Sequence, residues 1–203
     1  MDAQEPTSAL IPDPAVVVGL VEKLVEGIWP RSEADRKALF QRLGFTSGAS
    51  WDDAVPASPL NHYALSTKQP GEISSSWNSF NGRFLGVSMQ LYTAMDTDNP
   101  STRQGFEDFR QHFTTIYGEG VNPWHDPIIQ AWVWNVNGRR IAIRFFNLQH
   151  SGMLLTVDDA GLATAAEAEA RRRNAPMHWN DSEERTSPFN LPQLNLPQRG
   201  VRT

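Results

Sequence analysis

The chain has 203 residues, of which 39% are hydrophobic, so it can bury a substantial core and wholesale disorder is excluded. Its net charge of −5 and the lack of a basic stripe argue against nonspecific binding to nucleic acid or to a membrane surface. The absence of Cys excludes disulfides, thiolate catalysis and Cys-based metal sites. Because we find no signal-peptide pattern and no membrane-spanning apolar run, we expect a soluble, cytoplasmic protein.

Two helices are predicted near the N-terminus. Asp13-Pro14 supplies an N-cap followed by proline at the first helical position, and apolar residues then recur at helical spacing to about Gly27. Ser32 begins the second helix, and Gly44 suits the left-handed position that ends it. A short Trp-Pro element joins the two, so the pattern predicts a helical hairpin.

A long loop and then a pair of strands are predicted next. Residues 46–72 are rich in Ser, Pro, Gly and Asn and show no period. The strands cover 73–80 and 84–95, with Asn81-Gly82 between them, and the second strand alternates apolar and polar residues. A strict two-residue turn places Trp77 on the wrong face. Either a bulge shifts the register, or the first strand is a polar edge strand.

A third helix is predicted from Ser101, which opens an S-x-x-Q capping box, to Gly118. Large apolar side chains recur along one face of this helix: Phe106, Phe109, Phe113 and Ile116. Such a stripe is typical of a helix that packs over a sheet.

The strongest local signal lies in residues 128–146, where two apolar runs meet at Asn137-Gly138. Asn-Gly supplies the positive φ angles of a type I′ turn, so it predicts a β-hairpin. The turn pairs Val136 with Arg139, Trp134 with Ile141, Trp132 with Ile143 and Gln130 with Phe145. We expect the hairpin face that carries both tryptophans to be buried in the core.

A strand at 153–157 and an Ala-rich helix to about Arg173 complete the pattern. Asp158 or Asp159 is expected to cap this helix, and Glu169 precedes Arg173 at the favourable i,i+4 spacing.

The order of elements predicts one α+β domain over residues 13–173. We expect an antiparallel sheet of about five strands, with the N-terminal helical hairpin and the further helices packed on one face. Residues 1–12 are expected to form a flexible leader. Residues 174–203 are polar and contain several prolines, which predicts a flexible or surface-wrapping tail.

Motifs that indicate catalysis or cofactor binding are absent from the sequence. We find no nucleophile elbow, phosphate-binding loop or dinucleotide-binding motif, and the five His do not lie at metal-ligand spacing. We therefore expect no enzyme activity, no cofactor and no metal site. Trp124-His125-Asp126-Pro127 is the one stretch that suits general-base chemistry, and a structured contact loop is the competing interpretation.

Features between Val17 and Val157 resemble the immunity proteins of bacterial polymorphic toxin systems. The resembling stretches are Ile28-Trp29-Pro30-Arg31-Ser32, Leu43-Gly44-Phe45 and Ile116-Tyr117-Gly118, followed by the Trp-bearing strand, the Asn-Gly turn and the apolar strands. The loop at 46–72 and the C-terminal tail depart from this pattern. The resemblance implies a small, non-catalytic α+β protein of the cytoplasm that binds a cognate toxin domain and occludes its active site.

Acidic loops suit a basic toxin partner, because opposite charge steers association. With an aromatic anchor, these acids define the predicted partner-binding residues: Asp52, Asp53, Asp96, Asp98, Trp124, His125 and Asp126. A small-ligand-binding protein or enzyme is an alternative, with a pocket near His125 and Asp126 between the sheet and the Phe-rich helix. A secretion chaperone or adaptor is another alternative. No nucleic-acid or membrane partner is expected.

Overall fold

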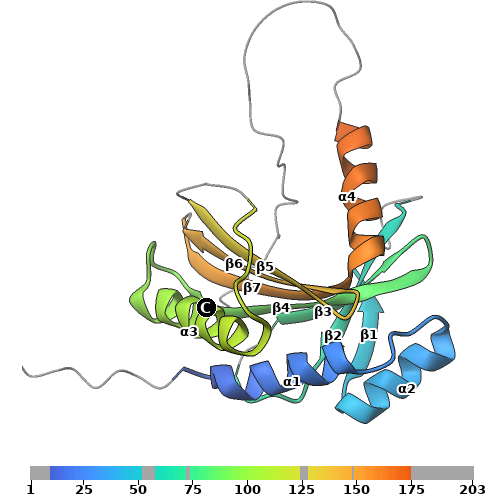
Figure 1. Cartoon of the computed structure of the whole chain (residues 1–203), viewed down its shortest axis with the longest axis horizontal. Coiled ribbons are helices and arrows are strands. Elements are labelled where there is room, and N and C mark those ends of the chain that lie inside the picture. Colours follow the sequence, from blue (N-terminus) through green and yellow to red (C-terminus); the bar gives the residue numbers. More distant parts are fainter. Residues whose placement is uncertain (1–9, 52–57, 72–73, 124–127, 148, 175–203) are drawn as a thin grey trace, which may run out of the picture. The chain divides into compact units, whose positions relative to one another are not determined.

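The computed structural model describes residues 10–51, 58–71, 74–123, 128–147 and 149–174. Contacts divide the chain into two units, residues 1–166 and 167–203. Within the described residues, the chain forms four helices and one seven-stranded antiparallel sheet (Figure 1). The predicted α+β class is therefore confirmed, and the sheet has more strands than the five expected.

The helices are α1 (Pro14–Glu26), α2 (Glu33–Leu43), α3 (Pro100–Tyr117) and α4 (Ala160–Asn174). The strands are β1 (Thr46–Ser50), β2 (Leu60–Ser66), β3 (Ser74–Phe80), β4 (Arg83–Ala94), β5 (Ile129–Val136), β6 (Arg139–Asn147) and β7 (Ser151–Asp159). In the sheet their order is β1-β2-β3-β4-β7-β6-β5. Two meanders, β1 to β4 and β5 to β7, are thus joined by the pairing of β4 with β7.

Most of the predicted leader and tail, residues 1–9 and 175–203, lies outside the described residues. Among the helices that the structure describes, none is both long and apolar enough to span a bilayer.

The first two helices begin and end as their capping residues predict. The Asp13 side chain accepts a hydrogen bond from the Ala15 N–H at 2.8 Å. Ser32 and Asp35 form a complete capping box at the start of α2. Gly44 ends α2 with a φ of 71°, the left-handed conformation that favours glycine.

Helix α3 starts earlier than predicted. Its N-cap is Asn99, whose side chain accepts the N–H groups of Ser101 and Thr102, and Pro100 occupies the first helical position. Ser101 therefore lies inside the helix instead of capping it, because the Asn-Pro pair supplies a better start.

The predicted loop at 46–72 is wrong in part, since it contains β1 and β2. Tyr63 of β2 pairs with Trp77 of β3, and their rings stack with centroids 4.0 Å apart. These short strands have little apolar alternation of their own. They form because β3 offers an edge to pair with, which a local pattern does not reveal.

Of the two alternatives for the first strand of this pair, the bulge is the correct one, and it lies between β3 and β4. The register shifts between Asn78 and Ser79, and Trp77 then pairs with Val87. Trp77 is 7% exposed and belongs to the main core. The polar-edge alternative is wrong, because β3 is hydrogen-bonded on both sides.

The hairpin of β5 and β6 has the predicted register at every one of the four pairs. Trp134 is 3% exposed, as expected for a core residue. Trp132 is only partly buried, and the Arg110 guanidinium lies 4.6 Å from its ring centroid. The prediction of a fully buried face therefore holds for Trp134 and only partly for Trp132.

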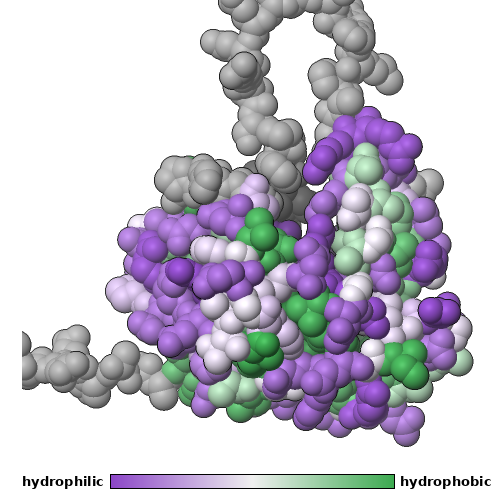
Figure 2. Space-filling model, viewed as in Figure 1, coloured by the Kyte–Doolittle hydropathy of each residue, from purple (hydrophilic) through white to green (hydrophobic). Residues whose placement is uncertain are grey.

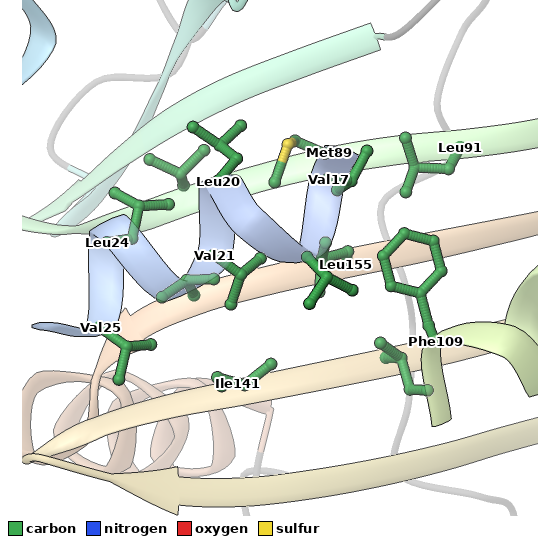
Figure 3. Packing of buried hydrophobic residues seen from close by; sticks show 14 of the residues in the cluster. Val17, Leu20, Val21, Leu24, Val25, Met89, Leu91, Phe109, Ile141 and Leu155 are labelled. Atoms are coloured by element: carbon green, nitrogen blue, oxygen red, sulfur yellow. The ribbon is translucent and has the colours of Figure 1, made fainter. Parts of the chain in front are cut away.

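Helices α1 and α3 bury the centre of the sheet. Figure 3 shows Val17, Val21 and Leu24 of α1 directed toward the strands that carry Met89, Ile141 and Leu155. From α3, three rings are at most 1% exposed: Phe106, Phe109 and Phe113. Ile116, predicted to share that stripe, is 42% exposed at the helix end.

The prediction that all the helices pack on one face is wrong, because the start of α4 (residues 160–166) packs in a cluster separate from the core under α1, α2 and α3. α1, α2 and α3 lie on one side (Figure 1), with α1 beside α3 and α2 beside β1. The predicted helical hairpin is only roughly matched, because α1 packs chiefly against α3 and α2 against β1. In α4, Ala163 packs against Phe80 and Leu85 in a separate cluster. β7 ends at Asp159 and α4 begins at the next residue, so no loop separates them. The Asp159 side chain accepts the Leu162 N–H at the start of the helix.

We expect Phe109→Ala to lower the free energy of unfolding by about 3–5 kcal/mol, because it leaves a cavity beneath α3. The matched control is Ile116→Ala on the same helix, where the exposed side chain predicts a loss below about 1 kcal/mol. Equilibrium unfolding in urea measures both. Equal losses for the two variants would contradict this description of the core.

Alkaline pH is expected to destabilise the fold through Tyr117. Burial raises the pKa of its hydroxyl to about 12, and Glu22 and Glu26 add to the effect. The unfolded chain loses this proton near pH ~10, so the unfolded state binds fewer protons there and the contribution of Tyr117 to stability falls between these two pKa values.

Tyr117→Phe should therefore lose stability less steeply than the wild type between about pH 10 and pH 12. Tyr92 keeps part of the dependence, since burial also raises its pKa. Urea unfolding at several pH values gives the two slopes. Identical slopes would show that Tyr117 does not titrate as described.

Candidate functional site

One end of the sheet brings together loops that are far apart in the sequence. Ala94, at the end of β4, and Asn147, at the end of β6, both pair with Ser151 of β7. The segment after β4 and the turn between β6 and β7 therefore meet. We call the exposed residues there the acidic end: Met95, Asp96, Asp98, Ile128 and His150.

Ser151 holds the loop between β4 and α3 in place. Its hydroxyl donates to the Asp96 carbonyl at 2.7 Å and accepts the Asn99 N–H at 2.8 Å. Its own N–H also donates to the Asp96 carbonyl, at 3.0 Å. Ser151 is 1% exposed and the bonds of its hydroxyl are partly buried, so they hold both ends of the loop.

Asn147 connects the same loop to the start of β5. Its Oδ1 accepts the Asp98 N–H at 2.6 Å, and its own N–H donates to the Ile128 carbonyl at 3.0 Å. On the other side of the turn, the His150 Nδ1 lies 3.1 Å from the Met95 carbonyl oxygen. The acidic end is therefore one hydrogen-bonded unit.

The two carboxylates differ in their surroundings. Asp98 forms an ion pair with Arg103, whose guanidinium lies 4.8 Å from the Phe145 ring centroid. Both members of that pair are well exposed, so the pair adds little stability and stays open to a partner. Asp96 is exposed, and its carboxylate has no hydrogen-bond or ion-pair partner within the described part of the chain.

Exposed apolar side chains accompany these acids. Met95 is 77% exposed and Ile128 is 45% exposed. Figure 2 shows that hydrophobic residues on the face in view form separate patches among hydrophilic ones, so exposure alone does not mark an interface. At the acidic end these two apolar side chains lie near Asp96 and the Asp98–Arg103 pair, so one exposed surface combines apolar and charged groups.

Five of the predicted partner-binding residues lie outside the described residues: Asp52, Asp53, Trp124, His125 and Asp126. Asp96 and Asp98 are brought together at the acidic end, as is Ile128, which follows soon after Asp126 in the sequence. Trp51, the neighbour of Asp52, lies at the opposite end of the sheet. Its N–H donates to the carbonyl of His62, and His62 pairs with Asn78 near the β3–β4 turn.

A polar network on β2, β3 and β4, on the sheet face opposite the core residue Trp77, was not predicted from the sequence. Asn78 Oδ1 lies 2.8 Å from His62 Nδ1 and accepts the Ser76 hydroxyl, while Asn78 Nδ2 donates to the Ser88 hydroxyl at 2.9 Å. Asn78 and Ser76 are each 6% exposed. Polar residues that alternate with Trp77 were the available signal, but the network also needs β2, whose sequence has little apolar alternation to mark it as a strand. Its bonds satisfy buried polar groups across three strands.

The space between α3 and the sheet is filled by phenylalanine rings, and the pocket predicted near His125 and Asp126 lies outside the described residues. The described residues contain no group of three or more side chains that could hold a metal ion. Comparison with family models, curated proteins and solved structures found no match.

We expect Ser151→Ala to lower the free energy of unfolding by about 1–3 kcal/mol, because it removes a buried hydroxyl that bonds to two backbone groups. It should also speed amide exchange at Asn99. Ser101→Ala, an exposed serine in the next helix, is the matched control and should change neither quantity. An unchanged exchange rate at Asn99 would mean that Ser151 does not hold this loop.

Proposed function

We propose that this protein is an immunity-type protein, which binds a cognate bacterial toxin domain and neutralises it by occluding its active site. The proposal rests on the acidic end. There, Asp96 and Asp98 lie near the exposed Met95 and Ile128, on loops that hydrogen bonds of Ser151 and Asn147 hold in place. The resemblance of the sequence to immunity proteins supports the same function.

The charges of this surface suit a partner with a basic face. Exposed carboxylates act over about 8–10 Å at physiological salt and raise the rate at which a cationic surface is captured. Among the described residues Asp96 has no ion-pair partner, so it can take a partner cation, and Asp98 already orients the guanidinium of Arg103. A partner Lys or Arg can therefore find defined carboxylate geometry at this end.

The apolar side chains supply the affinity that exposed charges lack. Burying Met95 and Ile128 under a partner removes apolar surface from water, at about 25 cal/mol for each Å². Because the loops are already fixed, binding orders few further groups, which lowers its entropic cost.

The test is co-expression with a toxin domain encoded next to this gene. We expect the wild-type chain to restore growth and to elute with that domain as one complex. Asp96→Lys should weaken the complex about tenfold or more, since it places a cation against a basic partner. Glu26→Lys makes the same charge change at an exposed position of α1 and serves as the control.

Continued killing in the presence of folded wild-type chain, or separate elution of the two proteins, would overturn the proposal. Equal effects of Asp96→Lys and Glu26→Lys would place the interface away from the acidic end. Circular dichroism of each variant shows whether it is folded before binding is compared.

A further inference from the structure

A basic groove lies between α2 and β1, the edge strand farthest from β5 in the sheet. It has a volume of about 590 Å³, and its charged lining residues are Arg36, Lys37 and Lys68. No carboxylate is among the residues that line it. Glu33 lies 3.9 Å from Arg36 and 2.8 Å from Lys37, so it offsets one of the three positive charges. The groove still carries an excess of positive charge in a chain whose net charge is −5.

The cations are positioned differently. The Arg36 guanidinium lies 4.1 Å from a Trp77 ring centroid, and its side chain is only 13% exposed, so its position is fixed. Lys37 is 69% exposed and bonds to Glu33 at 2.8 Å, a surface pair that a ligand carboxylate can replace at little cost. Lys68 is exposed and adopts a φ of 56°, which is uncommon for a residue other than glycine.

The groove borders an open strand edge. Among the described residues, β1 pairs with β2 and with no strand on its outer side. Its sequence, Thr-Ser-Gly-Ala-Ser, contains none of the charges or prolines that commonly protect an edge. The register is irregular between Ser47 and Ser50, but Thr46 and Ser47, which line the groove, are regularly paired.

We propose that the groove and the outer edge of β1 bind an extended acidic segment of a partner protein. The segment adds to the sheet as a further strand through main-chain hydrogen bonds. Because side chains of a strand alternate between its two faces, acidic residues at every second position all face α2. There they meet Arg36, Lys37 and Lys68.

A second copy of this chain is a poorer occupant of the same edge. Pairing of β1 with β1 would bring two sets of the same three cations together, and like charges at an interface are costly. An acidic strand instead neutralises them. This surface lies on the opposite edge strand from the β5 hairpin, and the inference does not rest on the toxin-binding proposal.

The test uses the full chain and a fluorescein-labelled decapeptide of alternating Glu and Thr, followed by fluorescence anisotropy. We expect saturable binding that weakens as salt is raised, and no binding of the matched Lys-Thr peptide. The double variant Lys37→Glu and Lys68→Glu should weaken binding about tenfold or more. Lys23→Glu, at an exposed position of α1, is the control and should leave it unchanged.

A modified peptide separates strand addition from simple charge attraction. Two versions of the Glu-Thr peptide are made, one with N-methyl groups on the odd-numbered amides and one with them on the even-numbered amides. Both keep the charge of the peptide, but only one of them loses the N–H groups that face β1. Loss of binding by one version supports the proposal. Equal binding of all the acidic peptides, no binding of the unmodified one, or a dimer on a sizing column that the double variant abolishes would overturn it.

Discussion

The pairing of β4 with β7 is the constraint on which the rest of the structure depends. It joins the meander of β1 to β4 with that of β5 to β7, and α3, which connects them, must therefore cross the sheet. At this seam the backbones approach closely. A Cβ at Gly86 would lie 2.2 Å from Asp158 Oδ1 and 2.3 Å from the Val157 carbonyl oxygen, so only glycine fits without a shift.

The same pairing explains both the core and the acidic end. In the middle of the sheet, Val87 and Met89 of β4 lie beside Val157 and Leu155 of β7, beneath α1 and α3. Past the end of this register, Ala94 meets Ser151, and the loop that follows β4 is held by the hydroxyl of that serine. A strand pairing that buries apolar surface at its centre thus presents fixed acidic loops where it ends.

Elements with local chemical signals could be predicted from the sequence. Asn137-Gly138 set the hairpin and its register, and Ser32 with Asp35 set the start of α2. β1 and β2 could not be predicted, because short polar strands depend on a neighbour that is distant in the sequence. The face of the sheet against which the start of α4 packs also depends on tertiary structure, since β7 continues into this helix without a loop.

For the candidate site, the sequence predicted some of the residues but not how they are held together. Asp96 and Asp98 were named because they are acids in a loop between elements, and the structure brings them together with Ile128. Their connection through Asn147 and Ser151 joins residues that no sequence pattern links. The cations of the groove were missed for a similar reason, because Lys68 meets Arg36 and Lys37 only once β1 and β2 are in place.

Hydrogen exchange of this chain, measured alone and with a toxin domain encoded next to its gene, shows directly whether a partner binds at the acidic end. We expect slower amide exchange within 95–99 and 147–151 in the complex, with α2 unchanged. Slower exchange confined to α1 or α2, with 95–99 and 147–151 exchanging as in the free protein, would contradict it.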